Sequence, residues 1–198
     1  MTRIEDAIAV IDAGADALGL NFVESSPRYV DLEVAKELSD VSAGLIARVG
    51  VFLDASQQQI ENTIKRVDLD VLQFHGSEKA SECEKWGIPY VKALRVTKTM
   101  DWTLLSEDYQ RACCLLLDTF KPGIEGGTGE VFDWDLWPNL SDIKLVLAGG
   151  LEPGNVKNAI KATNPYGVDV STGVETSRKG VKSSRLIEEF VKAAKFEV

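Results

Sequence analysis

One aspartate has the surroundings that acid–base chemistry needs. Asp118 ends the apolar run CLLLDT, and the glycine-rich stretch FKPGIEGGTG comes directly after it. Because side chains alternate along a strand, Cys114, Leu116 and Asp118 share one face. A carboxyl group at the end of an inward row, beside a loop whose backbone can approach a ligand, suits general acid or base catalysis. The alternative interpretation is a turn or helix-cap aspartate.

Two late turns have the composition of a phosphate site. In LAGGLEPGN, Gly149 and Gly150 precede Pro153, which we expect in the first turn of a helix, and helix N-termini bind phosphate. In VDVSTGVE, Ser171 supplies a hydroxyl group and Gly173 supplies bare backbone. Each turn alone is equally well read as a tight turn without a ligand. Because both follow adjacent strands, together they predict a phosphate site.

Four other polar residues follow or end strand-like runs. Arg28, in SSPRY, can clamp a carboxylate or phosphate with two hydrogen bonds, although its spacing alone favours a solvated surface arginine. Gln73 and His75 share one face of LQFHG, and the only histidine of the chain is as well explained by a structural role as by a catalytic one. Asp169 shares a strand face with Ser171, so we expect it to point inward.

Composition excludes several classes of function. The net charge of −9 argues against nucleic-acid binding, and it means that local features must hold any anionic substrate. No apolar run approaches the length of a membrane span. The three cysteines have no metal-ligand spacing, so we expect no metal site and reduced thiols in a cytoplasmic protein.

Seven apolar runs predict strands, and eight segments between and before them predict helices. The strands are expected at 16–22, 45–53, 70–74, 90–96, 112–119, 143–148 and 167–171. The helices are expected at an opening segment whose Thr2 and Glu5 form a capping box, and at 32–39, 56–66, 78–86, 100–109, 133–137, 153–162 and 183–195. Lys92 and Arg48 lie within strands, where we expect them to pair with buried carboxylates inside the barrel.

Alternating strands and helices predict a parallel sheet with right-handed crossovers. An open doubly wound sheet needs a glycine turn after an early strand, and none is present. A (βα)8 TIM barrel gathers its site at many strand ends and binds phosphate late in the chain, which fits the turns above. We therefore predict one α/β barrel domain over residues 1–198 that lacks the first β-strand.

The motifs in combination resemble the phosphoribosylanthranilate isomerase family of tryptophan biosynthesis. The resemblance runs through TRIEDA, GADALGLNF, SPRYV, RVGVF, LQFHG, LLLDT with GGTGEVFDW, LAGGLEPGNV and VDVSTGVE. It implies an Amadori rearrangement of a small phosphorylated substrate, without metal or organic cofactor. Asp118 matches the general acid, Arg28 meets the anthranilate carboxylate, and Asp169 orients the anthranilate amine. The phosphate-side loops match Gly127, Gly129, Gly149, Gly150, Ser171 and Gly173.

The resemblance also implies a cysteine base on the first strand, in a segment like Lys-Ile-Cys-Gly-x-Thr-Arg. The printed chain joins this pattern at the x position, so we expect either a longer native protein or a truncated form with little activity. Two other interpretations stay open. One is a different phosphate-binding barrel of the same pathway, and the other is a non-catalytic phosphate-ligand-binding barrel or pseudoenzyme. The oligomeric state is expected to be a monomer or a homodimer.

Overall fold

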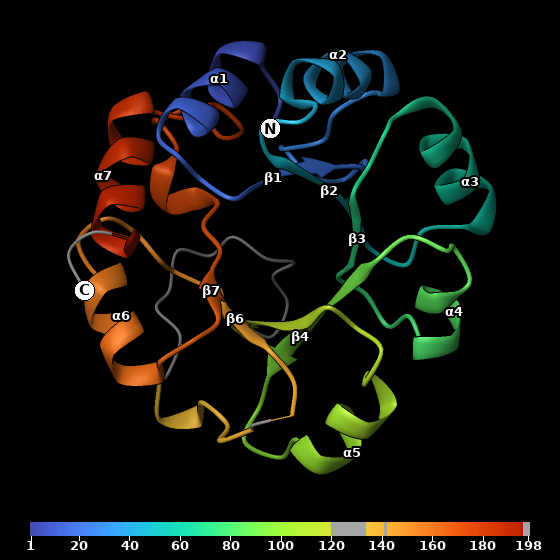
Figure 1. Ribbon diagram of the computed structural model, residues 1–198, viewed down its shortest axis with the longest axis vertical. Coiled ribbons are helices and arrows are strands. Elements are labelled where there is room, and N and C mark those ends of the chain that lie inside the picture. The colour runs from blue at the N-terminus through green and yellow to red at the C-terminus, as the bar shows by residue number, and fades with distance from the viewer. Residues whose placement is uncertain (120–133, 141, 196–198) are drawn as a thin grey trace.

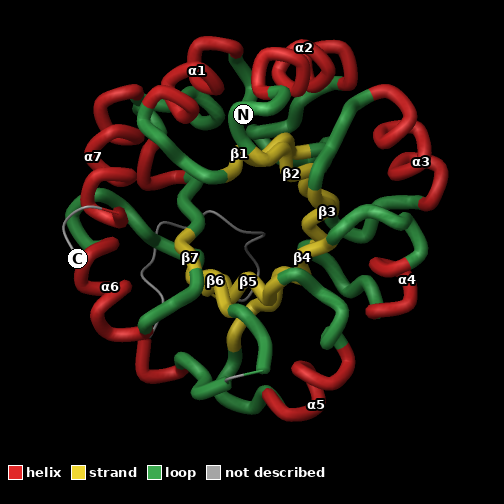
Figure 2. Tube along the Cα trace, viewed as in Figure 1, coloured by secondary structure: helices red, strands yellow, loops and turns green. Residues whose placement is uncertain are grey.

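Seven parallel strands form one curled sheet, and helices surround it (Figures 1 and 2). The computed structural model describes residues 1–119, 134–140 and 142–195. The spatial order of the strands follows the chain. The strands are β1 (Ala17–Asn21), β2 (Ala47–Phe52), β3 (Val71–Phe74), β4 (Tyr90–Val96), β5 (Cys114–Thr119), β6 (Leu145–Leu147) and β7 (Gly167–Val168).

The helices that follow and precede these strands pack on the outside of the sheet (Figure 2). They are α1 (Ile4–Asp12), α2 (Leu32–Ser42), α3 (Gln57–Arg66), α4 (Ala80–Glu84), α5 (Trp102–Asp108), α6 (Val156–Thr163) and α7 (Ser184–Lys195), with 3-10 turns η1 (Trp134–Leu136) and η2 (Thr172–Val174). All seven predicted strands are confirmed; β4 has the predicted bounds, and the other six are shorter than predicted. The helix predicted at 133–137 is instead the short turn η1 in its described part.

Two apolar layers hold the sheet. The larger lies between the strands and the helices and contains Leu115, Leu117, Phe52 and Phe74, each at most 1% exposed. The smaller lies inside the curl of the sheet, where Ala93, Leu116 and Ala148 meet. Since Leu116 points inward, Asp118 two residues later points to the same side, as the alternation predicted. The apolar interior therefore ends at the carboxyl end of the strands, where a site can form.

Lys92 and Arg48 make ion pairs with carboxylates as predicted, but the predicted location of these pairs inside the barrel is wrong. Lys92 Nζ lies 3.0 Å from Glu78 Oε2, while its neighbours Val91 and Ala93 pack in the interior layer. Lys92 therefore faces the helices, because adjacent residues of a strand point to opposite sides. Arg48 lies 2.8 Å from Asp70, whose side chain is 43% exposed at the start of β3.

The sheet has a seam between its first and last strands. In the described residues, β1 pairs only with β2 and β7 pairs only with β6. Residues near the start of the chain bridge the seam: the Met1 amine donates to the Gly19 carbonyl, and Thr2 Oγ1 donates to the Gly180 carbonyl at 2.7 Å. This arrangement confirms the prediction of a barrel that lacks one strand.

The predicted capping box at the start of α1 is wrong. The helix begins at Ile4 with Arg3 as its N-cap residue, and no side chain caps it. The Thr2 hydroxyl group is used across the seam instead. Arg3 pairs with Asp6, and Asp6 Oδ2 accepts the Lys182 backbone N–H at 3.1 Å. Contacts between distant segments have therefore replaced the local cap.

We predict that an added strand will stabilise the molecule. An N-terminal extension of roughly ten residues with a Lys-Ile-Cys-Gly strand can pair with both β1 and β7 and bury side chains on two faces. Each fully buried Val, Leu or Ile contributes about 1.5–3 kcal/mol, so three or four amount to much of a typical stability of about 5–15 kcal/mol. Thermal melts should show a higher Tm than the printed chain.

An extension of equal length made of glycine and serine is the control for this comparison. It adds chain without an apolar strand, so its Tm should match that of the printed chain. Equal Tm values for both extensions would show that the seam does not accept a strand.

Candidate active site

Polar side chains from β3 and β5 meet at the carboxyl end of the sheet. His75 directly follows β3, and its Nε2 lies 3.5 Å from Asp118 Oδ2 near the end of β5. Gln73 Nε2 lies 3.4 Å from His75 Nδ1. The Gln73 amide and the His75 ring are within hydrogen-bond distance, and the tautomer of His75 decides which nitrogen donates. The structure thus brings together three of the residues predicted from the sequence.

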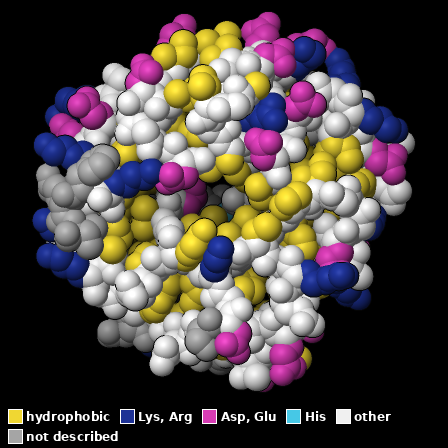
Figure 3. Space-filling model, viewed as in Figure 1, with side chains coloured by type: hydrophobic (Ala, Val, Ile, Leu, Met, Phe, Trp, Pro, Cys, Tyr) yellow, Lys and Arg dark blue, Asp and Glu magenta, His cyan; other side chains and the backbone are white. Residues whose placement is uncertain are grey.

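Asp169 brings a second carboxyl group into the same electrostatic environment. It directly follows β7, and the residue is exposed at the carboxyl end of the sheet, where the space-filling view shows a hollow in the molecule (Figure 3). Partial loss of hydration among the strand ends is the largest cause of a raised pKa of Asp169, although the residue keeps exposed surface, and the like charge of Asp118 raises this pKa further. His75 and Lys182 act in the opposite direction. Two neighbouring carboxyl groups with different environments are the usual basis of acid and base roles.

The first glycine turn lies between β6 and α6. Gly149 and Gly150 have φ values of +87° and +64°, a left-handed conformation that favours glycine. Asn155 Nδ2 donates to the Gly150 carbonyl at 2.9 Å, and Asn155 Oδ1 accepts the Glu152 N–H at 2.9 Å. The predicted place of Pro153 in the first helical turn is wrong, because these two bonds close a turn first and α6 begins only at Val156.

The second glycine turn packs directly on the first. A Cβ atom at Gly173 would lie 1.9 Å from the Leu151 carbonyl oxygen, so only glycine fits there. The contact brings η2 beside the residue that follows Gly150. Both turns predicted to hold phosphate are therefore adjacent, at the same end of the sheet as Asp118. The predicted residues Gly127 and Gly129 lie outside the described residues.

Arg28 is neither a solvated surface residue nor an available fork. Its side chain is 17% exposed and forms a two-pronged ion pair with Glu175, with Nε–Oε1 at 2.7 Å and Nη2–Oε2 at 3.0 Å. Nη2 also donates to Thr172 Oγ1 at 3.1 Å. The two-pronged hydrogen bonding that was expected for a substrate is thus made to Glu175 instead.

Glu175 and Lys182 were not identified from the sequence. Lys182 is 8% exposed, and its Nζ donates to the Ser171 carbonyl at 2.8 Å and to Glu175 Oε1 at 3.3 Å. Burial lowers the pKa of Lys182 against the opposing effect of Glu175. Burial alone would raise the pKa of Glu175, but Arg28 and Lys182 outweigh it and the net shift is downward. The only sequence signal for Glu175 was its place at the end of VDVSTGVE.

The cysteines lie away from the carboxyl end of the sheet. Cys83 is buried in α4, and Cys114 is buried at the start of β5, opposite to Asp118. Burial raises the pKa of these thiols to about 12 and about 11, which keeps both protonated and poorly nucleophilic at neutral pH. Cys113 is exposed beside Cys114. None of the three is placed to act with Asp118.

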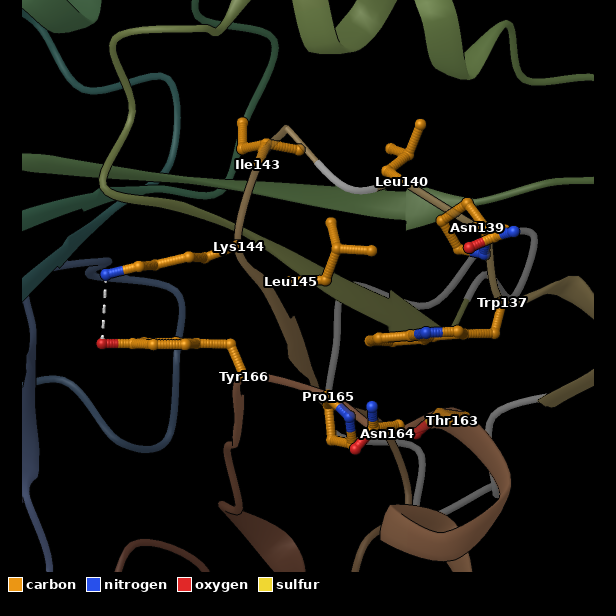
Figure 4. Close-up of a pocket in the computed structure, with 11 residues that line it drawn as sticks. Trp137, Asn139, Leu140, Ile143, Lys144, Leu145, Thr163, Asn164, Pro165 and Tyr166 are labelled. Atoms are coloured by element: carbon orange, nitrogen blue, oxygen red, sulfur yellow. Dashed lines mark hydrogen bonds between the residues drawn. The ribbon is translucent and has the colours of Figure 1, made fainter.

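A cavity of about 490 Å³ lies at the other end of the sheet (Figure 4). Its walls include Trp137, Leu140, Lys144 and Tyr166, and the Lys144 ammonium donates to Tyr166 Oη at 3.3 Å. Lys144 and Tyr166 precede β6 and β7, so this cavity is at the amino ends of the strands. It is remote from both carboxyl groups and is not the candidate site.

Among the described residues, no group of three or more His, Cys, Asp or Glu side chains is arranged to hold a metal ion. No helix within the described ranges is long and apolar enough to cross a membrane.

We predict that Asp169→Asn will raise the Tm at neutral pH. A raised pKa means that the ionised carboxylate is less favourable in the folded chain than in the unfolded chain, so Asp169 lowers stability once pH exceeds its ordinary pKa of about 3.9. Below that pH the group is protonated in both states and the penalty is absent. The gain in Tm should therefore grow between about pH 4 and neutrality.

Thermal melts of both proteins across this pH range test the prediction. Asp12→Asn, at an exposed position of α1, is the matched control for removing one carboxylate. A difference in Tm that is the same at every pH would rule out the proposed cause.

Comparison with known proteins agrees with this geometry. A family model described as N-(5'-phosphoribosyl)anthranilate (PRA) isomerase matches residues 1–193. N-(5'-phosphoribosyl)anthranilate isomerases from Pseudomonas fluorescens (strain Pf0-1) and Thiobacillus denitrificans (strain ATCC 25259 / T1) are 46% and 43% identical over 195 residues. Each alignment covers 98% of this chain and 95% of the relative.

Solved structures give the same result. Phosphoribosyl anthranilate isomerase from Thermotoga maritima superposes with a TM-score of 0.85 at 36% identity. A phosphoribosyl anthranilate isomerase in complex with reduced 1-(o-carboxyphenylamino)-1-deoxyribulose 5-phosphate superposes with a TM-score of 0.81 at 34% identity. Both alignments cover 98% of this chain and 95% of the other chain. The chain belongs to the N-(5'-phosphoribosyl)anthranilate isomerase family.

Proposed function

We propose that the site at the carboxyl end of the sheet catalyses the Amadori rearrangement of N-(5'-phosphoribosyl)anthranilate in tryptophan biosynthesis. The product is 1-(2-carboxyphenylamino)-1-deoxyribulose 5-phosphate. One observation carries the proposal: the inward carboxyl groups of Asp118 and Asp169 share one end of the sheet with two adjoining glycine turns. The reaction needs an acid near the ribose ring and an anchor for the phosphate, and this arrangement supplies both.

Asp118 is the general acid. Its carboxyl group protonates the ribose ring oxygen, the bond from C1' to that oxygen breaks, and the nitrogen lone pair forms a C1'=N iminium ion. A base then removes the C2' proton, and the electrons of that C–H bond form the enol, which tautomerises to the ketone. One proton is given and one is taken, so the product is an isomer of the substrate. His75, 3.5 Å from Asp118, helps to orient the acid.

Three groups of residues bind the substrate. Gly149, Gly150, Ser171 and Gly173 surround the phosphate. Asp169 accepts a hydrogen bond from the anthranilate amine and stabilises the positive iminium nitrogen by its charge. Arg28 meets the anthranilate carboxylate. Because the chain has a net charge of −9, these local donors must overcome its general repulsion of a phosphorylated acid.

The base is a cysteine on a strand that fits the seam between β7 and β1. This position follows from the family pattern Lys-Ile-Cys-Gly-x-Thr-Arg, in which the printed chain supplies x, Thr2 and Arg3. A strand there would end at the same edge of the sheet as β5 and β7. The reaction takes place in the cytoplasm, in keeping with the reduced state of the three cysteines. No cofactor is needed, because the bond changes are driven by proton transfers and by the nitrogen lone pair of the substrate.

We predict that Asp118→Asn will lower kcat by about 10²–10⁴-fold, the usual contribution of a positioned general acid. The substitution is made in the chain extended with the Lys-Ile-Cys-Gly strand, because that strand carries the proposed base. Asparagine keeps the size of the side chain but cannot give up a proton. Turnover is followed as conversion of substrate to product, and the Kd of the reduced product analogue should change little.

The same strand with Ser in place of Cys is the control for the base. A hydroxyl group is a far weaker base than a thiolate, so this chain should bind the analogue and remain nearly inactive. Wild-type turnover in Asp118→Asn would show that Asp118 is not the general acid. Binding without turnover in every extended chain would instead support a non-catalytic barrel.

We predict that Ser171→Asp will selectively weaken binding of phosphorylated ligands. The new carboxylate would lie where the phosphate dianion binds, and like charges repel. Calorimetry with the reduced product analogue and with its dephosphorylated form measures the effect. Ser171→Ala is the matched control, since it removes the hydroxyl group without adding charge. Equal losses for both ligands in Ser171→Asp would show that this turn does not contact the phosphate.

A further inference from the structure

The guanidinium group of Arg28 is held by three hydrogen bonds. Glu175 takes Nε–H and one N–H of Nη2, and Thr172 Oγ1 takes the other N–H of Nη2. Because the group is planar, a carboxylate on the Nε–Nη2 edge fixes Nη1 on the opposite side. Among the described residues, no acceptor lies within hydrogen-bond distance of Nη1. The two N–H groups of Nη1 are therefore the donors that remain for a ligand.

Glu175 is itself fixed by its surroundings. Its side chain is 3% exposed, Oε1 accepts the Gly180 N–H at 3.2 Å, and Lys182 Nζ lies 3.3 Å from the same oxygen. The turn at Gly180 packs on the segment before Arg28, since a Cβ atom at Gly180 would lie 2.8 Å from the Pro27 carbonyl oxygen. Hydrogen bonds thus hold Glu175, and the turn at Gly180 packs against the segment that leads into Arg28. The ion pair is therefore fixed on both sides of the seam.

The ion pair also lies beside the proposed phosphate turn. Thr172, which accepts from Arg28, stands between Ser171 and Gly173 in the chain. The anchored guanidinium group is therefore next to the site, and Nη1 is its only nitrogen that makes no hydrogen bond to the described residues. An arginine with this constraint can recognise one carboxylate at one place, whereas an unconstrained one would also compete for the phosphate.

We propose that Glu175 is a positioning residue that holds Arg28 so that Nη1 meets the carboxylate of the anthranilate ring. The inference rests on the proposed function, because it assumes that the substrate carries this carboxylate. Glu175 touches no substrate atom in this scheme. It acts through Arg28 and determines the preference for an ortho-carboxylated aryl group over a plain aryl group.

The test compares two ligands that differ only in this carboxylate. They are 1-(2-carboxyphenylamino)-1-deoxyribitol 5-phosphate and 1-phenylamino-1-deoxyribitol 5-phosphate. For the unsubstituted chain, the Kd ratio of the phenyl to the carboxyphenyl ligand should be about 10- to 100-fold, as expected for a hydrogen bond to a charged group. Since both ligands carry the phosphate, any change in phosphate binding cancels in the ratio.

Glu175→Gln should lower this Kd ratio about tenfold and leave the Kd of the phenyl ligand nearly unchanged. Glutamine keeps the shape but presents an N–H group to one of the Arg28 donors, so the guanidinium group turns away. Arg28→Ala should bring the ratio to about 1, and adding Glu175→Gln to it should cause no further loss. Thr172→Val, which removes one anchor with little change in volume, should give a smaller decrease and serves if Glu175→Gln does not fold.

The outcomes separate this inference from the proposed function. If the unsubstituted chain binds neither ligand, the proposed function fails and the inference fails with it. If it prefers the carboxylated ligand and Glu175→Gln keeps that preference, only the inference is overturned. A lower Tm with equal weakening of both ligands would show a purely structural role for Glu175, which also overturns the inference.

Discussion

The main constraint on this molecule is the seam between β1 and β7, where the backbone hydrogen bonds of the sheet stop. Side chains hold the two edges together instead. Arg28 follows β1 and Glu175 follows β7, so their buried ion pair joins the first and last parts of the sheet. Breaking a buried pair leaves one charge without compensation, which costs several kcal/mol. The pair therefore gives the open sheet a defined closure at the end where the site is.

A second buried ion pair, between Lys92 and Glu78, lies on the helix-facing side of the sheet and fixes the backbone near His75. Lys92 Nζ donates to the carbonyl groups of Phe74 at 3.2 Å and Gly76 at 2.6 Å, the two residues that flank His75. Its partner Glu78 accepts the backbone N–H of Gly76 at 2.9 Å. A charge in the helix-facing layer thus holds the backbone on either side of an inward-facing imidazole. The proposed catalytic site depends on polar groups outside it as much as on those that line it.

The sequence predicted the parts of the structure that depend on local pattern. Short apolar runs identified all seven strands, and alternation placed Asp118 on the inner face beside Leu116. Several of the errors concern side chains whose partners are distant in the chain. Thr2 was expected to cap its own helix, yet it bonds Gly180. Arg28 was expected either to clamp a substrate or to be solvated, yet it bonds a residue 147 positions away. Neither the spacing of residues along the chain nor the composition predicts such distant partners. Glu175 and Lys182 were missed for the same reason, because their roles exist only after the barrel has formed.

Asp118 and Asp169 lie close together although this arrangement does not favour the folded chain. Stability therefore does not explain why both carboxyl groups are present at the site. Asp169 faces a partly dehydrated interior near Asp118, and the raised pKa of Asp169 records that ionisation is unfavourable there. A neutral amide of similar size would avoid this cost. An iminium ion forming between the two groups would reverse the balance, because a positive charge in the same enclosure stabilises both carboxylates. The arrangement is thus unfavourable for the resting protein and favourable for a cationic intermediate, which is the property expected of a catalyst for this rearrangement.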